Sequence, residues 1–221
     1  MKILFYTNKG KKRKNNQDAI LVNKIYQNDM QEPILIENFN GKNLIVADGI
    51  GGLPYGELAS KEVLKVFEEN ENEVLEKIIQ KARKKLRQIK EDKNIKDLGT
   101  VLAGIIIRGN RATIFNVGDS RVYQVRGDFL YKHSEDHTFE GNIITSAVTS
   151  ELENLKIYTK EIEIEKGDVF FICTDGVWGQ LSEDELEDCI DENIQTFGEK
   201  LLEKLWTTEL SDNLSFIIVE A

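Results

Sequence analysis

Four aspartates stand at the ends of apolar runs that the sequence predicts to be buried strands: Asp48, Asp119, Asp175 and Asp212. Taken singly, each has a plain structural explanation, because Asp-Gly and Asp-Asn pairs are common turn signals. As a set they suggest more, since rigid strand ends are where a fold can converge several carboxylates on one point. Clustered carboxylates repel one another, so a divalent cation would have to hold them together.

Oxygen ligands of this kind select hard cations such as Mg²⁺ or Mn²⁺. Two such ions about 3.5–4 Å apart would clamp a phosphoryl group and lower the pKa of a bridging water. Gly49, Gly51 and Gly52, which follow Asp48, fit this picture. Glycine permits a positive φ and lets the backbone approach an ion closely. The pattern therefore favours a two-metal site that acts on a phosphoryl group.

These carboxylates need elements that bring strand ends together. Runs of β-branched and apolar residues predict strands at 3–7, 19–26, 33–37, 44–47, 98–107, 111–117, 121–125, 157–164, 168–174 and 214–219, with hairpins among those of the first half. Apolar residues at helical spacing predict two helices between 57 and 93, which meet at 68–73, and two more at 182–192 and 196–209. Strand runs with helices grouped in the middle and at the end indicate an α+β fold, with helices packed on antiparallel sheets.

The length of the chain limits the number of domains, and its charge limits the kinds of partner. Its 221 residues suffice for one sizeable core, so a single domain over residues 1–221 is expected. A net charge of −10 argues against nucleic acid or a membrane surface as the main partner. The sequence shows no signal-type segment and no apolar stretch near the ~20 residues of a membrane span, so a cytoplasmic protein is expected. Cys173 and Cys189 lack metal-ligand and disulfide-framework spacing and are expected to be reduced thiols.

Seven motifs along the chain carry a family resemblance. They are residues 13–18 (RKNNQD), 46–52 (VADGIGG) with 56–60 (GELAS), 99–100 (GT), 116–123 (NVGDSRVY), 136–138 (DHT), 174–178 (TDGVW) and 212–215 (DNLS). In this order and spacing they resemble the PP2C (PPM) family of metal-dependent protein Ser/Thr phosphatases over almost the whole chain. The resemblance implies a PP2C-like four-layer α-β-β-α sandwich, in which two antiparallel sheets are flanked by helices.

The resemblance also implies a role for each site residue. Asp48 would be the carboxylate that bridges two metal ions, either Mn²⁺ or Mg²⁺. The Gly49 carbonyl would be a ligand of one ion, and Asp175 and Asp212 would be ligands of the other. A metal-bridging hydroxide would then attack phosphorus in line, without a phosphoenzyme.

Three further positions concern the substrate and a third ion. Arg13 would grip the substrate phosphate, a task suited to the guanidinium fork. Asp18 would orient metal-bound water. Asp119 would hold a third ion weakly or transiently, because Gly179 stands where many relatives place another Asp.

Other departures from the family affect metal binding, the source of the proton for the leaving group, and substrate selection. Gln17 stands where many relatives have Glu, which would weaken one metal modestly. Ile50 occupies the slot of a proposed general-acid histidine, and His133 and His137 are expected to be structural. The segment 137–150 is short where bacterial relatives insert a longer flap, with residues 142–148 in place of the block that follows it, so substrate selection is the property most affected.

Two groups of conspicuous side chains have plain structural readings. Trp178 and Trp206 lie in apolar patterns, which favours packing in the core or just below the surface over stacking on a ligand. The lysines around Arg13 are expected to form a solvated basic loop; they are Lys9, Lys11, Lys12 and Lys14.

The leading hypothesis is hydrolysis of phosphoserine and phosphothreonine on proteins, with the products of a Ser/Thr kinase as partners and a monomeric enzyme. Two alternatives come from other classes of protein. A pseudophosphatase would bind a phosphoprotein or partner without turnover, although the retained Asp48, Asp175 and Asp212 argue against it. A regulatory module that senses Mn²⁺ is the third reading. Turnover of a phosphothreonine peptide with and without Mn²⁺ separates the first hypothesis from the other two.

Overall fold

Two antiparallel sheets form the centre of the computed structural model, which describes residues 1–140, 143–151 and 155–221. The first sheet has the order β4 (Ile34–Ile36), β1 (Lys2–Asn8), β15 (Leu214–Glu220), β14 (Val169–Cys173), β8 (Arg121–Arg126) and β9 (Phe129–Lys132). The second has the order β13 (Tyr158–Glu163), β7 (Arg111–Val117), β6 (Gly99–Arg108), β5 (Asn43–Gly49), β2 (Asp18–Val22) and β3 (Lys24–Tyr26), with β12 (Val148–Thr149) paired to β6. A small hairpin joins β10 (Thr138–Phe139) to β11 (Ile143–Ile144).

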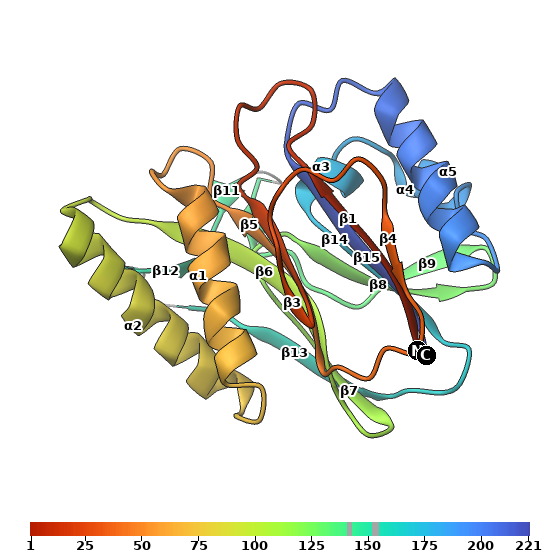
Figure 1. The fold of residues 1–221 in the computed structure, drawn as a ribbon, viewed down its shortest axis with the longest axis horizontal. Coiled ribbons are helices and arrows are strands. Elements are labelled where there is room, and N and C mark those ends of the chain that lie inside the picture. Colours follow the sequence, from red (N-terminus) through yellow and green to blue (C-terminus); the bar gives the residue numbers. More distant parts are fainter. Residues whose placement is uncertain (141–142, 152–154) are drawn as a thin grey trace.

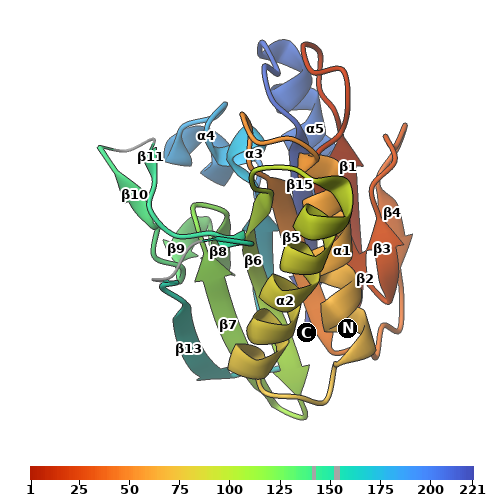
Figure 2. The same cartoon turned by 90° about the vertical axis from the view of Figure 1, so that its left-hand side faces the viewer.

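Helices cover the outer face of each sheet, as Figures 1 and 2 show. On the second sheet lie α1 (Gly56–Glu69) and α2 (Leu75–Lys93), and on the first lie α3 (Asp175–Trp178), α4 (Glu183–Glu187) and α5 (Ile194–Thr207). The expected α+β sandwich with four layers is confirmed. None of these helices is both long and apolar enough to cross a lipid bilayer, as far as the described residues go.

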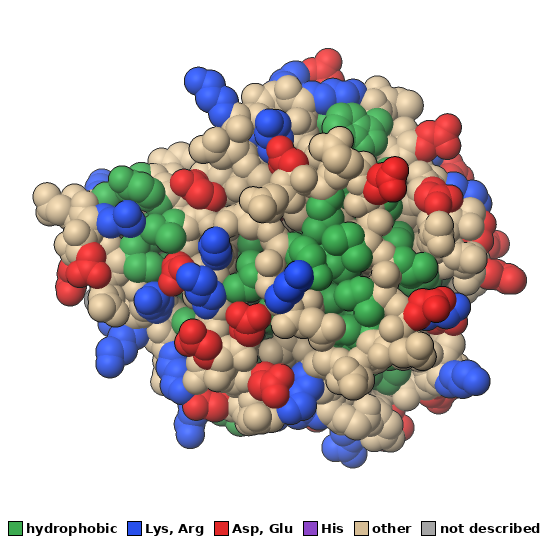
Figure 3. Space-filling view, viewed as in Figure 1, with side chains coloured by type: hydrophobic (Ala, Val, Ile, Leu, Met, Phe, Trp, Pro, Cys, Tyr) green, Lys and Arg blue, Asp and Glu red, His purple; other side chains and the backbone are tan. Residues whose placement is uncertain are grey.

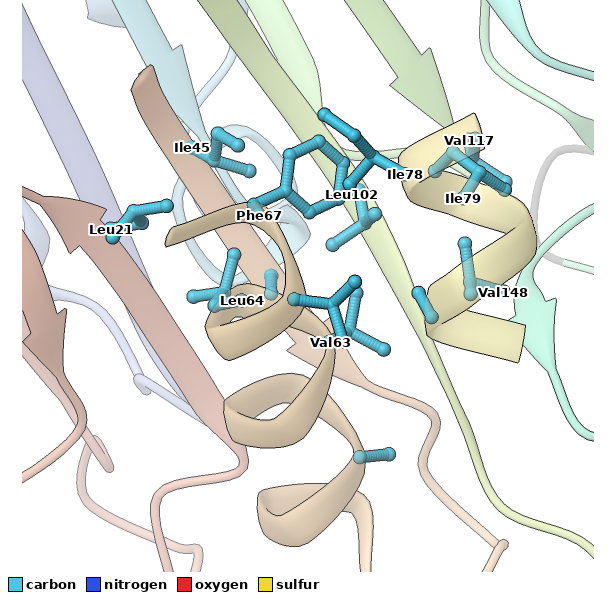
Figure 4. Packing of buried hydrophobic residues seen from close by; sticks show 14 of the residues in the cluster. Leu21, Ile45, Val63, Leu64, Phe67, Ile78, Ile79, Leu102, Val117 and Val148 are labelled. Atoms are coloured by element: carbon cyan, nitrogen blue, oxygen red, sulfur yellow. The ribbon is translucent and has the colours of Figure 1, made fainter. Parts of the chain in front are cut away.

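Three buried apolar clusters fill the spaces between the four layers. Figure 4 shows the cluster under the first two helices, where Val63, Leu64 and Phe67 of α1 point at the second sheet. Each fully buried side chain of this size contributes roughly 1.5–3 kcal/mol of transfer free energy. On the face shown in Figure 3, apolar side chains gather over the region of β1 and β4, and Ile34 and Leu35 of β4 are partly exposed.

The alternation of side chains along the strands decides where the acidic residues point. Ile20 of β2 and Val46 of β5 belong to the cluster between the two sheets. Asp18 and Asp48 have the same parity as these residues, so both enter the space between the sheets at one end. The inner layer is therefore apolar along most of its length and acidic at that end.

Several local expectations need correction. The run 19–26 is two strands, because Asn23 adopts a positive φ of 58° and breaks it. The short strands β9 to β12 and the short helix α3 were not predicted, and the helix expected at 182–192 is regular only over Glu183–Glu187. Of the hairpins expected in the first half, β2 and β3 form one, whereas β1 pairs with β4 and with β15 at the other end of the chain. Such distant pairing leaves no local sequence signal.

Candidate functional site

Asp48 lies near the end of β5, directly opposite Asp18 of β2 in the antiparallel ladder. Burial raises the pKa of Asp48 well above its usual value, and the charges of Asp18 and Asp175 raise it further. The backbone around it is fixed by a hydrogen bond of 2.7 Å from the Thr100 hydroxyl to the Asp48 carbonyl. The backbone that carries this carboxyl group is therefore held in place, and a negative charge on the carboxyl group is unfavourable there unless a cation is present.

The structure explains the presence of glycine differently at each of the three positions after Asp48. A Cβ on Gly49 would lie 2.4 Å from the backbone of Gly56, so glycine is needed there for the close approach of β5 to the start of α1. A positive φ, expected for all three glycines, occurs only at Gly52, where it is 88°. Gly51 has a negative φ and open space around it, so the conformational argument is wrong for Gly49 and Gly51.

Asp18 is the centre of a buried polar network. The Thr174 hydroxyl donates to Asp18 Oδ2 at 2.9 Å, and the Ser215 amide donates to the same hydroxyl group at 3.1 Å. Asp18 Oδ1 is also buried, yet it has no partner among the described residues. Burial raises the pKa of Asp18 to about 7, against the hydrogen bonds from Ser215 and Thr174, which lower it. The network thus holds one carboxylate oxygen and leaves the other available.

Asp175 and Asp212 bring two further carboxylates to the same end of the sandwich. Asp175 is the first residue of α3, directly after β14, and burial followed by the charge of Asp212 raises its pKa. Asp175 Oδ1 is buried without a partner in the described part of the chain. Asp212 accepts a hydrogen bond of 2.6 Å from Arg13 Nη2, and this bond raises the pKa of Arg13.

Asp119 lies at the turn between β7 and β8. Burial and the charge of Asp175 raise its pKa to about 6. The Trp178 indole donates to the Asp119 carbonyl at 3.1 Å, and the Arg121 guanidinium stacks on that indole with its carbon 3.5 Å from the ring centre. Arg121 is also paired with Asp136. The helix that begins with Asp175 is therefore joined to the turn that carries Asp119.

The donor set at this end of the sandwich suits hard divalent cations. Four carboxyl groups with raised pKa values lie in this region, and the carboxylate of Asp212 lies beside them; the four are Asp18, Asp48, Asp119 and Asp175. Two buried oxygens lack partners, which is the state expected of atoms that serve as ligands. Within residues 1–140, 143–151 and 155–221, no three acidic, His or Cys side chains are already drawn together into coordination geometry. Electrostatic repulsion among these carboxylates opposes such a cluster when no cation is bound.

Both histidines make contacts that support the expected structural role. His137 is buried, and its Nδ1 accepts a hydrogen bond of 3.1 Å from the Gly118 amide. His133 contacts Gln124 and Lys160. Ile50 stands where a general-acid histidine was proposed for relatives. Its side chain has no polar group, and its backbone amide donates to the Gly99 carbonyl.

Three expectations about the surroundings of the site need comment. Trp178 is partly buried, as expected of a side chain that packs in the core or just below the surface, whereas Trp206 is 41% exposed, so that expectation is wrong for Trp206. The solvated basic loop is also wrong in part, because Lys11 and Lys12 bond groups at the end of α5. The segment after His137, which we expect to be short relative to bacterial relatives, contains the paired strands β10 and β11, and residues 141–142 lie outside the described residues.

The residues that sequence reasoning missed are Thr174 and Ser215, which surround Asp18. Both were within the recognised motifs, one before Asp175 and one after Asp212. The signal that could have found them is strand parity: each shares a side with apolar residues of the inner layer, Ile172 on β14 and Ile217 on β15.

The chain is similar to known phosphatases in both sequence and structure. The family described as "Protein phosphatase 2C" matches residues 11–215. Serine/threonine phosphatase stp of Listeria innocua is 24% identical, and the alignment covers 98% of this chain and 94% of that protein. Stp1 from Staphylococcus aureus has a similar structure, with a TM-score of 0.82, 22% identity and coverage of 99% of this chain and 94% of the other. The catalytic domain of PstP, solved in complex with two manganese ions, has a TM-score of 0.80 and 22% identity, and covers 100% of this chain and 99% of that one.

Proposed function

The chain belongs to the protein phosphatase 2C family, and from this premise we propose that it is a metal-dependent phosphatase that hydrolyses phosphoserine and phosphothreonine on proteins. The observation that carries the proposal is the convergence of Asp18, Asp48 and Asp175 at one end of the inner layer, with buried carboxylate oxygens that lack partners among the described residues. We propose that residues 1–221 act as a single domain, as a monomer, in the cytoplasm. Its substrates would be the products of a Ser/Thr kinase.

Four residues would hold the metal ions, which we propose to be Mn²⁺ or Mg²⁺. Asp48, the Gly49 carbonyl, Asp175 and Asp212 provide oxygen ligands, the type that these ions prefer. Two bound ions would supply a nucleophilic water of lowered pKa and offset the charge of the phosphate. Asp119 would hold a third ion weakly.

Two residues would act on the substrate and on the attacking water. Arg13 is 44% exposed and lies beside Asp212, so its guanidinium can bond a phosphate that arrives at the same place. Asp18, with one oxygen held by Thr174, would accept a proton or hydrogen bond from water through the other.

The decisive experiment is turnover of a phosphothreonine peptide with and without added Mn²⁺, with Asp175→Asn as the matched inactive variant. We expect metal-dependent release of phosphate by the wild type and nearly none by Asp175→Asn at limiting Mn²⁺. A pseudophosphatase would bind the same peptide without releasing phosphate at any Mn²⁺ concentration. That outcome, from a protein shown to be folded, would overturn the proposed activity in favour of a binding module.

A further inference from the structure

The loop between Asn8 at the end of β1 and Asp18 at the start of β2 carries Arg13. In Figure 1 it arches beside the segment that leads out of α5. Lys11 joins the two: its ammonium group donates to the carbonyls of Trp206 at 2.7 Å and Thr208 at 2.8 Å. Its backbone amide also donates to the Leu210 carbonyl at 3.0 Å.

The C-terminal end of α5 attracts the Lys11 ammonium group for two physical reasons. The last carbonyls of a helix have no partner within the helix, and the helix dipole makes this end negative. The ammonium of Lys11 compensates both effects from a segment that is remote in sequence. It also lies 5.6 Å from the centre of the Trp206 ring, a cation–π distance. Lys11 is therefore a C-terminal cap of α5.

A second attachment fixes the other side of the loop. The buried amide of Asn213 donates to the carbonyls of Lys9 at 3.1 Å and Asn15 at 2.9 Å, and accepts from the Gln17 amide at 2.8 Å. Gly10 fits against this segment with a φ of 72°, and a Cβ there would lie 2.3 Å from the Asp212 carbonyl. The loop is thus attached to residues 206–213 along most of its length.

We infer that Lys11 is a positioning residue for the phosphate grip: through α5 it sets the place of Arg13 relative to Asp212. The inference rests on the proposed function, because it assigns phosphate binding to Arg13. Arg13 is half exposed, and one of its guanidinium nitrogens, Nη2, bonds Asp212. When the guanidinium reorients toward phosphate this bond changes, whereas the contacts of Lys11 with the end of α5 do not involve Arg13 and hold the loop backbone in place. Preorganisation of this kind reduces the entropy lost on binding.

The test compares Lys11→Met with Lys14→Met. Both remove one positive charge from the same exposed loop, so long-range electrostatics change equally, but Lys14 is not part of the cap. We expect Lys11→Met to raise KM for a phosphothreonine peptide, and the inhibition constant of inorganic phosphate, by about 3- to 10-fold, with kcat changed less than about twofold, because binding common to ground and transition states appears in KM. Lys14→Met should match the wild type. Lys11→Arg, which can also donate to two carbonyls, should restore most of the affinity.

A double-mutant cycle with Arg13→Ala separates positioning from a general structural effect. If Lys11 acts through Arg13, Lys11→Met should add nothing to KM once the Arg13 side chain is removed. An equal rise in KM in both backgrounds, or a fall in kcat and melting temperature with KM unchanged, overturns the inference. Phosphate binding to the Mn²⁺-loaded protein, measured by calorimetry, reads the same effect without turnover, so failure of the proposed activity would not conceal the result.

Discussion

Asp18 and Asp48 face each other across neighbouring antiparallel strands at the same end of the inner layer, where Asp18 is buried and Asp48 is half-buried. Like charges directly opposite each other in a sheet are destabilising, and burial increases the cost. The Thr174 hydroxyl nevertheless holds the Asp18 carboxylate, and the Thr100 hydroxyl holds the backbone of Asp48. Stability is therefore given up at the site where a divalent cation is proposed to bind.

The first prediction follows from this repulsion. Asp48→Asn keeps the shape of the side chain and removes one charge, so the metal-free protein should become more stable, with a melting temperature higher by several degrees. Added Mn²⁺ should raise the melting temperature of the wild type much more than that of the variant, because ions that bind only the folded state stabilise it. Activity should fall by at least about 100-fold, since the proposed ligand of both ions is lost.

Asp92→Asn, on the exposed side of α2, is the matched control for that change. It should leave the melting temperature and its Mn²⁺ dependence as in the wild type. If the metal-free Asp48→Asn protein were less stable than the wild type, the carboxylates of Asp18 and Asp48 would not destabilise the metal-free fold by repelling each other, and the prediction would be refuted.

The second prediction concerns the hydroxyl group beside Asp18. Thr174→Val removes the donor to Asp18 Oδ2 and leaves the Ser215 amide without its acceptor, at a cost of about 1–3 kcal/mol in unfolding free energy. Activity should fall by roughly 10-fold or more because Asp18 is no longer held. Thr159→Val, on the exposed part of β13, serves as the control and should change neither value by much. Chemical denaturation and peptide turnover measure the two effects, and wild-type turnover in Thr174→Val would show that Asp18 needs no such support.

The sequence was sufficient for most of the elements and for singling out the acidic residues, but not for what surrounds them. Apolar periodicity locates α1, α2 and most strands, because each of these elements buries one face. Asp48 and Asp175 are conspicuous because each follows an apolar run and precedes glycine. Lys11 gives no such signal: its partners are carbonyl groups about 200 positions away, and a carbonyl group has no identity in the sequence. The pairing of β1 with β15 is invisible for the same reason.

The third prediction is a pH effect at His133. Burial, followed by the charges of Lys160 and Arg126, lowers its pKa, so the folded state favours the neutral ring. In that form Nδ1 accepts from Lys160 and Nε2 donates to Gln124, at 3.0 Å each. Because the pKa is lower in the folded state than in the unfolded chain, its contribution to stability is complete above about pH 6.5 and is lost as the pH falls through the folded pKa.

His133→Gln should therefore reduce the loss of unfolding free energy between pH 7.5 and pH 5, measured by urea denaturation at each pH. His137 titrates in both proteins, so the difference between the two profiles reports His133 alone. Parallel profiles would mean that His133 titrates alike in the folded and unfolded chains.

The last prediction concerns Gly179 and the proposed third ion. Gly179 has an ordinary helical conformation, but a Cβ there would lie 2.6 Å from the Asp175 carbonyl, which also accepts the Gly179 amide at 2.7 Å. Any side chain must therefore push the end of α3 away, and Asp175 and Trp178 move with it. Gly179→Asp alone would combine this distortion with the new carboxylate, so Gly179→Ala is the reference that isolates the charge. We expect Gly179→Ala to lower the melting temperature and to shift Mn²⁺ activation to higher concentration. Relative to Gly179→Ala, the Asp variant should be activated at lower Mn²⁺ if Asp119 and a third ion take part in catalysis. Identical activation curves for the two variants would mean that two ions suffice.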